Sequence, residues 1–366
     1  MKKTLLALAA IAASSAVFAQ SSVTLYGVVD ASVESVKGDK TVTRVTSGNL
    51  AGSRLGFKGT EDIGGGLKAN FVLENGLNVD TGATGSSTRF FDRAAWLGLA
   101  GGFGEVRLGR QDSPIGDIAG NVLGAQAYDD LKLLPTRAGN DFRRSDNAIT
   151  YLLPTMVPGL AAQVQYSTAS GVTSASGATG AEVAGSNYNK AMGLSVKYVA
   201  GPLSAGLGYE SIKDNATAAN DQKANATLVY AGYDFGAAKV TAYYDAETNY
   251  KVTAGAKRLT VLGAKVAVPF TPEFTMVAGL STARNVATLD TNGDNVQIVS
   301  LKGIYTLSKR TAVYALFTNV NNGADTYRSV DNADSGTAAP SSATANVPTA
   351  LAKTTHGIAV GVRHSF

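Results

Sequence analysis

The chain has 366 residues, of which 32 are Lys or Arg, 28 are Asp or Glu and none is Cys. A formal net charge of +4 is too small to create a general field for nucleic acid, so we expect no nucleic-acid partner. Without cysteine there are no disulfides, and stability must come from backbone pairing and burial. Hydrophobic residues are 45% of the chain and charged residues only 16%, which suits strands with one apolar and one polar face.

The first residues have the pattern of an export signal. Lys2 and Lys3 precede an apolar run from Leu5 to Phe18, which closes on the small residue Ala19. The run is shorter than a membrane-spanning helix, which needs about 20 apolar residues. We therefore expect a signal peptide over residues 1–19, and removing 19 of 366 residues leaves 347 as a single domain over 20–366.

After the signal, the chain falls into segments of about ten residues with alternating polarity, which is the period of a half-buried strand. In the first of them Val29 and Val33 lie on one face, while Asp30 and Glu34 lie on the other. The last segment alternates in the same way and finishes on Phe366.

The connections between these segments alternate in length. The short ones are 61–66, 100–104, 154–159, 200–202, 234–237, 269–273 and 307–310. The long ones are 37–50, 79–89, 112–145, 169–189, 213–222, 248–256, 285–295 and 321–354. Seven short and eight long connections join sixteen strands. Short inner turns and long external loops are typical of transmembrane barrels, and a sheet in lipid must close on itself. The predicted fold is all-β, a transmembrane antiparallel β-barrel of sixteen strands with an aqueous lumen.

The third long connection, 112–145, differs from the others. It is too long for a turn and too apolar for a solvated tail, so we expect it to fold into the barrel lumen and form a constriction. Its acids are candidates for the constriction lining: Asp112, Asp117, Asp129 and Asp130.

Charged residues inside strands should point into the lumen, because a lipid-facing Arg at the bilayer midplane costs about 2–4 kcal/mol. Arg54 alternates with the outward Leu55, and Glu74, Arg93 and Arg107 are further inward candidates. Two residues break the pattern, since Arg110 shares parity with Leu108 and Arg93 with Leu97. A bulge, a rim position or a subunit contact would explain either.

Basic wall residues would then face the acids of the inward loop. The wall set is Arg54, Arg93 and Arg144, with Arg143 beside it. Opposed charges across a narrow aqueous opening set ion preference, and an arginine cluster favours anions.

Catalytic groups are scarce. The two histidines, His356 and His364, are eight residues apart on one strand, or roughly 26 Å, and cannot share a metal ion. We expect no catalytic residues, no metal and no cofactor.

In sequence the chain resembles the general diffusion porins of Gram-negative bacteria, which are trimeric sixteen-stranded barrels of the outer membrane. The resemblance covers the mature chain and is carried by SSVTLYGVVDASVE, GSRLGFKGTEDIGGGLKANF, FDRAAWLGLAGGFGEVRLGRQ, DNAITY and GVRHSF. A PEFGG-like segment of many relatives is replaced here by DSPIGD.

This resemblance implies a homotrimer surrounded by outer-membrane lipid and lipopolysaccharide. It implies an inward third loop at 112–145, basic wall residues at Arg54 and Arg93, a further arginine at Arg143 or Arg144, and a wall acid at Glu74. It also implies that Phe366 is read by the barrel assembly machinery.

The resulting hypothesis is a channel for passive diffusion of small hydrophilic solutes and inorganic ions, with mild anion preference. The alternatives are a substrate-specific channel for a carboxylate, phosphate or sugar, an outer-membrane enzyme, and an adhesin or structural barrel.

Overall fold

The computed structural model describes residues 22–124, 128, 130, 136–137, 140–168, 190–214, 222–248, 258–286, 295–324, 326, 330 and 354–366. The expected signal peptide and Asp129 lie outside these residues. Within the described ranges, the helices are too short and too polar to cross a membrane.

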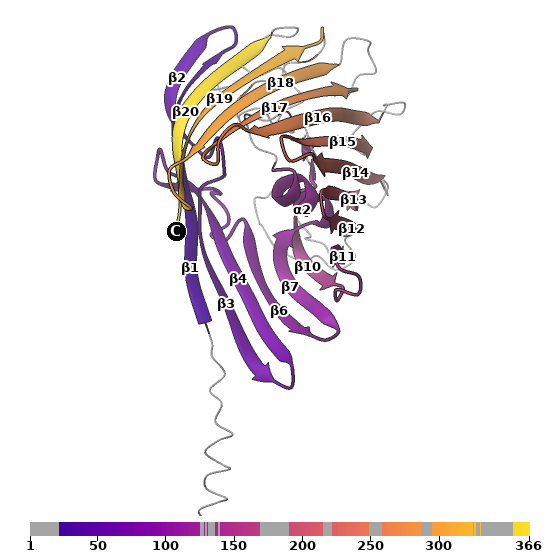
Figure 1. The fold of residues 1–366 in the computed structure, drawn as a ribbon. Coiled ribbons are helices and arrows are strands. Elements are labelled where there is room, and N and C mark those ends of the chain that lie inside the picture. Colours follow the sequence, from indigo (N-terminus) through magenta and orange to yellow (C-terminus); the bar gives the residue numbers. More distant parts are fainter. Residues whose placement is uncertain are drawn as a thin grey trace, which may run out of the picture.

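The described residues form β-strands almost throughout (Figure 1). The strands are β1 (Ser22–Lys37), β2 (Thr41–Ser47), β3 (Arg54–Gly64), β4 (Leu67–Asn78), β5 (Ala83–Thr84), β6 (Ala94–Gly101), β7 (Gly104–Asp112), β8 (Thr136–Arg137), β9 (Asn140–Asp141), β10 (Arg144–Leu152), β11 (Leu160–Ser167), β12 (Ala191–Ala200), β13 (Leu203–Asp214), β14 (Gln222–Asp234), β15 (Lys239–Thr248), β16 (Leu259–Pro269), β17 (Phe274–Arg284), β18 (Val296–Thr306), β19 (Thr311–Asn322) and β20 (Thr355–Ser365).

The strands form one antiparallel sheet that closes on itself, because the first strand, β1, pairs with the last, β20. The sheet contains eighteen strand segments. Of these, β5 is a two-residue extension, and β2 and β3 share one position by pairing with successive halves of β1. Sixteen wall strands remain, as predicted. The predicted first long connection, 37–50, contains strand β2, which pairs with β1. The β1–β2 hairpin therefore extends further than the alternation of polar and apolar residues indicated.

The connection lengths follow the predicted alternation. The turn between β3 and β4 is built from three consecutive glycines with positive φ, Gly64, Gly65 and Gly66, a backbone conformation that favours glycine. Since short turns lie at the inner side of the membrane in such barrels, the ends that carry the long connections face outward from the cell.

Side chains alternate between the lipid and the lumen along each strand. In β1, Val33 is 57% exposed, whereas its neighbours Ser32 and Glu34 are 4% and 2% exposed. The structure thus has the predicted arrangement, with apolar residues on the outer face of this strand and polar residues on the inner face.

The third long connection enters the lumen, as predicted (Figure 1). It begins with the short helix α2 (Pro114–Asp117), where the Ser113 side chain accepts a hydrogen bond from the Gly116 N–H. A single π-helical turn, η1 (Ile118–Val122), continues it. The strand before the loop, β7, ends at Asp112, and the strand after it, β10, begins at Arg144. Both positions lie within a residue or two of the predicted bounds of the loop.

The inward loop packs on the wall through apolar residues. Ile115, Ile118 and Leu123 are buried and share one apolar cluster with Leu228 of β14 and Ile298 of β18. The inner faces of these strands therefore carry apolar residues, although water alone in the lumen would favour polar ones. Part of the lumen is a packed core, and the channel is confined to the rest.

α2 lies close against the backbone of β13. A Cβ atom at Gly208 would stand 3.0 Å from the Ile115 Cα, which is closer than real Cβ contacts normally come. A glycine at this position lets the helix rest on the wall.

Candidate functional site

The candidate site is a cavity of about 510 Å³ in the lumen, between the inward loop and the opposite wall. Its lining is strongly polar and comes from β3, β4, β6, β7, β10, β11, the inward loop and the segment before β3: Leu50, Ala51, Arg54, Glu74, Arg93, Ala94, Trp96, Arg107, Gln111, Asp112, Asp117, Gly120, Asn121, Gly124, Arg143, Arg144 and Gln163. It lies at the outward-facing ends of several of these strands.

Five arginines reach this cavity from four segments of the chain. Arg54 and Arg144 are the first residues of β3 and β10, Arg143 precedes β10, and Arg93 precedes β6. Arg107 comes from the middle of β7. Because antiparallel neighbours place successive strand ends at one level, residues far apart in sequence converge here.

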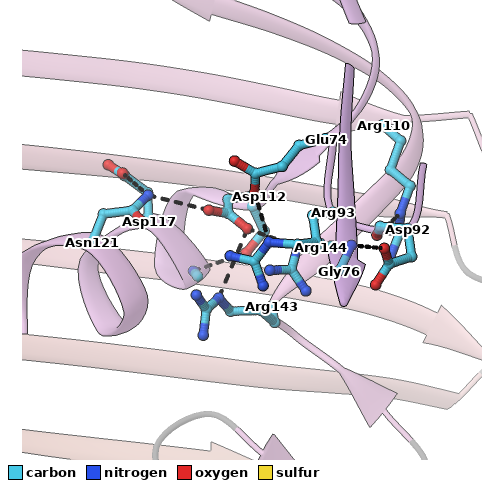
Figure 2. Close-up of polar contacts among 12 residues, drawn as sticks. Glu74, Gly76, Asp92, Arg93, Arg110, Asp112, Asp117, Asn121, Arg143 and Arg144 are labelled. Atoms are coloured by element: carbon cyan, nitrogen blue, oxygen red, sulfur yellow. Dashed lines mark hydrogen bonds and ion pairs between the residues drawn. The ribbon is translucent and has the colours of Figure 1, made fainter. Parts of the chain in front are cut away.

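Glu74 of β4 holds two of the arginines side by side. Its Oε1 lies 2.6 Å from the Arg93 Nε (Figure 2). Its Oε2 lies 3.6 Å from the Arg54 Nε. The Tyr26 hydroxyl donates a third contact to Oε2 at 2.9 Å. One carboxylate thus orients two guanidinium groups, and a net positive charge remains.

Asp112, at the end of β7, holds the other pair in the same way. Its Oδ1 lies 3.1 Å from the Arg144 Nε and 3.7 Å from the Arg143 Nε (Figure 2). The Asn121 amide donates to Asp112 at 3.1 Å and to Asp117 at 2.9 Å, and so connects the helical turn to the wall.

The remaining charges have partners outside the lining. The Lys197 ammonium, on the inner face of β12, lies 2.5 Å from the Asp117 Oδ2. Arg107 lies 2.7 Å from the carboxylate of Glu105, and its guanidinium stacks 4.2 Å from the Trp96 ring centroid. When Lys197 and Glu105 are counted together with the lining residues, the net charge around the cavity is +2. This positive charge comes from the four arginines that contact Glu74 and Asp112.

Most of the sequence-predicted site residues come together at this cavity. They are Arg54, Arg93, Arg143, Arg144, Glu74, Asp112 and Asp117. Trp96, Gln163 and Lys197 are not among the site residues predicted from the sequence. Alternation along β6 would have placed Trp96 inward, but a pairing of Lys197 with Asp117, eighty residues apart, has no local signal.

Asp130 lies elsewhere. It is fully buried, and its carboxylate accepts hydrogen bonds from the Tyr243 hydroxyl at 2.8 Å and the Ser300 hydroxyl at 3.4 Å. Ser281 donates to its backbone carbonyl at 2.7 Å. These partners are on β15, β18 and β17, so Asp130 anchors the inward loop to the wall and does not line the cavity.

A second anchor is Tyr128, whose hydroxyl donates to Glu34 of β1 at 3.0 Å. The Lys265 ammonium of β16 also donates to the Leu123 carbonyl. The inward loop is therefore tied to strands around much of the barrel wall.

The two residues that broke strand parity each have a structural reason. Arg93 precedes β6, so strand alternation does not govern it. Opposite Arg110, β10 contains a bulge between Ser145 and Ala148. Arg110 pairs there with Asp146 at 2.5 Å and donates to the Asp92 carbonyl at 2.6 Å.

The two histidines lie on the last strand, and neither is at the cavity. His364 contacts the Thr311 hydroxyl at 2.9 Å. In the part of the chain that the structure describes, no three His, Cys, Asp or Glu side chains form a group that could hold a metal ion.

A closed β-barrel whose lumen is narrowed by its own inward loop is the architecture of a membrane channel. A family model described as "Gram-negative porin" matches residues 5–325. The chain belongs to this family, and its location is the outer membrane.

Two relatives and two solved structures illustrate the similarity. "Outer membrane porin protein 32" of Delftia acidovorans is 33% identical over 391 residues, which cover 100% of both chains. An outer membrane porin protein of Bordetella pertussis is 29% identical over 272 residues, covering 68% of this chain and 70% of the relative. The structure of the "Anion-selective porin from Comamonas acidovorans" matches with a TM-score of 0.75 and 25% identity over 95% of this chain and 100% of the other. OmpT of Vibrio cholerae in its trimer form shares the fold, with a TM-score of 0.60 and 16% identity over 94% and 99% of the two chains.

Proposed function

We propose that this porin lets small hydrophilic solutes and inorganic ions diffuse passively across the outer membrane, with a mild preference for anions. The observation that carries the proposal is the composition of the cavity lining, which has five arginines and three carboxylates. A solute crosses without any chemical step, so the width of the opening and its charge select what passes.

The arrangement of charges supports anion preference. Arg54 and Arg93 lie on one side of the opening, Arg143 and Arg144 lie beside the loop, and a carboxylate orients each pair. Each pair of arginines shares a single carboxylate, so positive charge is in excess on both sides of the opening. One similar structure, the porin from Comamonas acidovorans, carries the description anion-selective.

A sugar-specific channel is less well supported. Such a channel needs a ladder of aromatic side chains along the path. Among the described lining residues Trp96 is the single aromatic, and the Arg107 guanidinium stacks on its ring. Two inward tyrosines, Tyr243 and Tyr314, are buried in polar contacts with Asp130 and Asp30.

The test is the reversal potential of the purified protein in a planar bilayer under a KCl gradient. We expect a triple variant, Arg54→Ala, Arg93→Ala and Arg144→Ala, to lower the anion-to-cation permeability ratio. A control variant removes the same charge from the inner turns and nearby strand ends, with Lys239→Ala, Lys309→Ala and Arg310→Ala. An unchanged permeability ratio in the triple variant would contradict the proposal that these arginines set the anion preference. Absence of conductance in the wild type would favour an adhesin or structural barrel.

We also propose the assembly and partners that the family resemblance implies. The barrel forms a homotrimer, is bounded by outer-membrane lipid and lipopolysaccharide, and is assembled by machinery that reads Phe366. Conductance steps grouped in threes would support the trimer, and single independent steps would contradict it.

A further inference from the structure

A second segment besides the inward loop leaves the wall and reaches the cavity. It is the connection between β2 and β3, residues 48–53, which folds against the inner face of β1. Asn49 and Ser53 are buried in this connection, and Leu50 and Ala51 line the cavity. We call residues 48–53 the inner strap. The cavity is thus bordered both by the inward loop and by the inner strap.

Asp30, on the inner face of β1, holds the inner strap at three points. Its carboxylate accepts a hydrogen bond from the Ala51 N–H at 3.0 Å. Its own N–H donates to the Ser53 hydroxyl at 3.0 Å, and that hydroxyl donates to the Asp30 carbonyl at 3.1 Å. The Gly48 N–H donates to the same carbonyl at 3.0 Å. Asp30 is fully buried, and its other carboxylate oxygen accepts from the Tyr314 hydroxyl at 2.5 Å, so Asp30 is itself fixed to β19.

The inner strap contacts both arginines of the Glu74 pair. The Arg54 guanidinium donates a hydrogen bond to the Gly52 carbonyl at 2.9 Å. The Arg54 Nε lies 3.6 Å from the Glu74 Oε2, which is an ion-pair distance but too long for a hydrogen bond. A Cβ atom at Gly52 would stand 3.4 Å from the Arg93 Nη1, so the inner strap also borders Arg93. The orientation of Arg54 at the opening therefore depends on where the inner strap holds the Gly52 carbonyl.

We propose that Asp30 and Ser53 are positioning residues for anion selectivity, because they hold the inner strap that fixes the Arg54 guanidinium at the opening. The inference rests on the proposed function, in which Arg54 favours anions. It also fixes the sign of an effect. Asp30 is an acid beside the lumen, so removing its charge alone would raise the anion-to-cation permeability ratio. Releasing the inner strap would let Arg54 leave the opening and would lower the ratio.

The test measures the reversal potential under a KCl gradient, together with Tm, for the purified wild type and its variants. We expect Asp30→Asn to lower the permeability ratio by up to about twofold, which is the screened effect of one unit charge about 8 Å from the ion path. Ser53→Ala leaves every charge in place and should change the ratio in the same direction. Asn225→Ala is the matched control, since it removes hydrogen bonds to Tyr209 and Thr248 outside the lumen. It should lower Tm without moving the ratio.

A double variant tests whether the inner strap acts through Arg54. When Arg54→Ala is already present, Ser53→Ala should cause no further fall in the ratio, because the group that the strap positions is absent. A rise or no change in Asp30→Asn, an unchanged ratio in Ser53→Ala, an equal fall in Asn225→Ala, or a full further fall in the double variant would overturn the inference. If Asp30→Asn does not fold, Ser53→Ala and the double variant carry the test. A wild type without anion preference would contradict the proposed function instead, so the two failures are distinguishable.

Discussion

Lys197 should influence ion selectivity although it does not line the cavity. Its ammonium neutralises Asp117, which does line it, at 2.5 Å. In a Lys197→Met variant, Asp117 keeps its hydrogen bond from Asn121 at 2.9 Å and loses its basic partner. The net charge around the opening then falls from +2 to +1, counting the lining residues with their outside partners Lys197 and Glu105.

The size of the effect follows from Coulomb's law. A unit charge in water changes the energy of an ion about 8 Å away by about 0.5 kcal/mol, with opposite signs for chloride and potassium. The free-energy difference between the two ions therefore changes by about 1 kcal/mol, or about fivefold in permeability ratio. At about 0.1 M salt, screening over a Debye length of about 10 Å reduces this to about twofold.

The assay is the reversal potential under KCl gradients at low and high salt. We expect Lys197→Met to lower the anion-to-cation ratio about twofold at low salt and less at high salt. Lys197→Arg, which keeps the charge, should match the wild type, and the double variant Lys197→Met with Asp117→Asn should recover the wild-type ratio. A wild-type ratio in Lys197→Met at low salt, or a deficit that persists in the double variant, would refute the reasoning.

Two further predictions concern the inward loop and the C-terminus. Asp130→Ala leaves the hydroxyls of Tyr243 and Ser300 without their carboxylate, which costs about 1–3 kcal/mol for each buried group left unpaired. We expect a lower Tm and noisier open-channel current, and a Tm equal to that of the wild type would show that Asp130 is not an anchor. Phe366 pairs through its backbone with Gly27 at 3.1 Å in both directions, so its deletion also removes contacts. If it is an assembly signal, deletion will lower the amount of folded barrel in cells more than the yield of refolding in detergent, and equal losses would indicate a structural role alone.

The sequence by itself determined the architecture of the wall. Because strand side chains alternate with a period of two, Val33 and Glu34 could be assigned to opposite faces before any pairing was known. Alternating connection lengths predicted sixteen strands, and the length and apolar content of 112–145 predicted an inward loop. The cost of charge in lipid indicated that Arg54 and Glu74 point inward, and both line the cavity.

Tertiary structure alone decided which residues meet inside the barrel. Lys197 and Asp117, or Tyr243 and Asp130, come together because barrel closure brings distant strands around one short loop, and no local pattern carries that information. Asp130 and Asp117 are both aspartates of the inward loop, yet Asp130 is a buried anchor and Asp117 lines the opening. Opposite the bulge in β10, Arg110 forms an ion pair with Asp146, which simple alternation does not predict. Alternation assigns a side chain to a face, whereas its partner on that face depends on the register of the whole closed sheet.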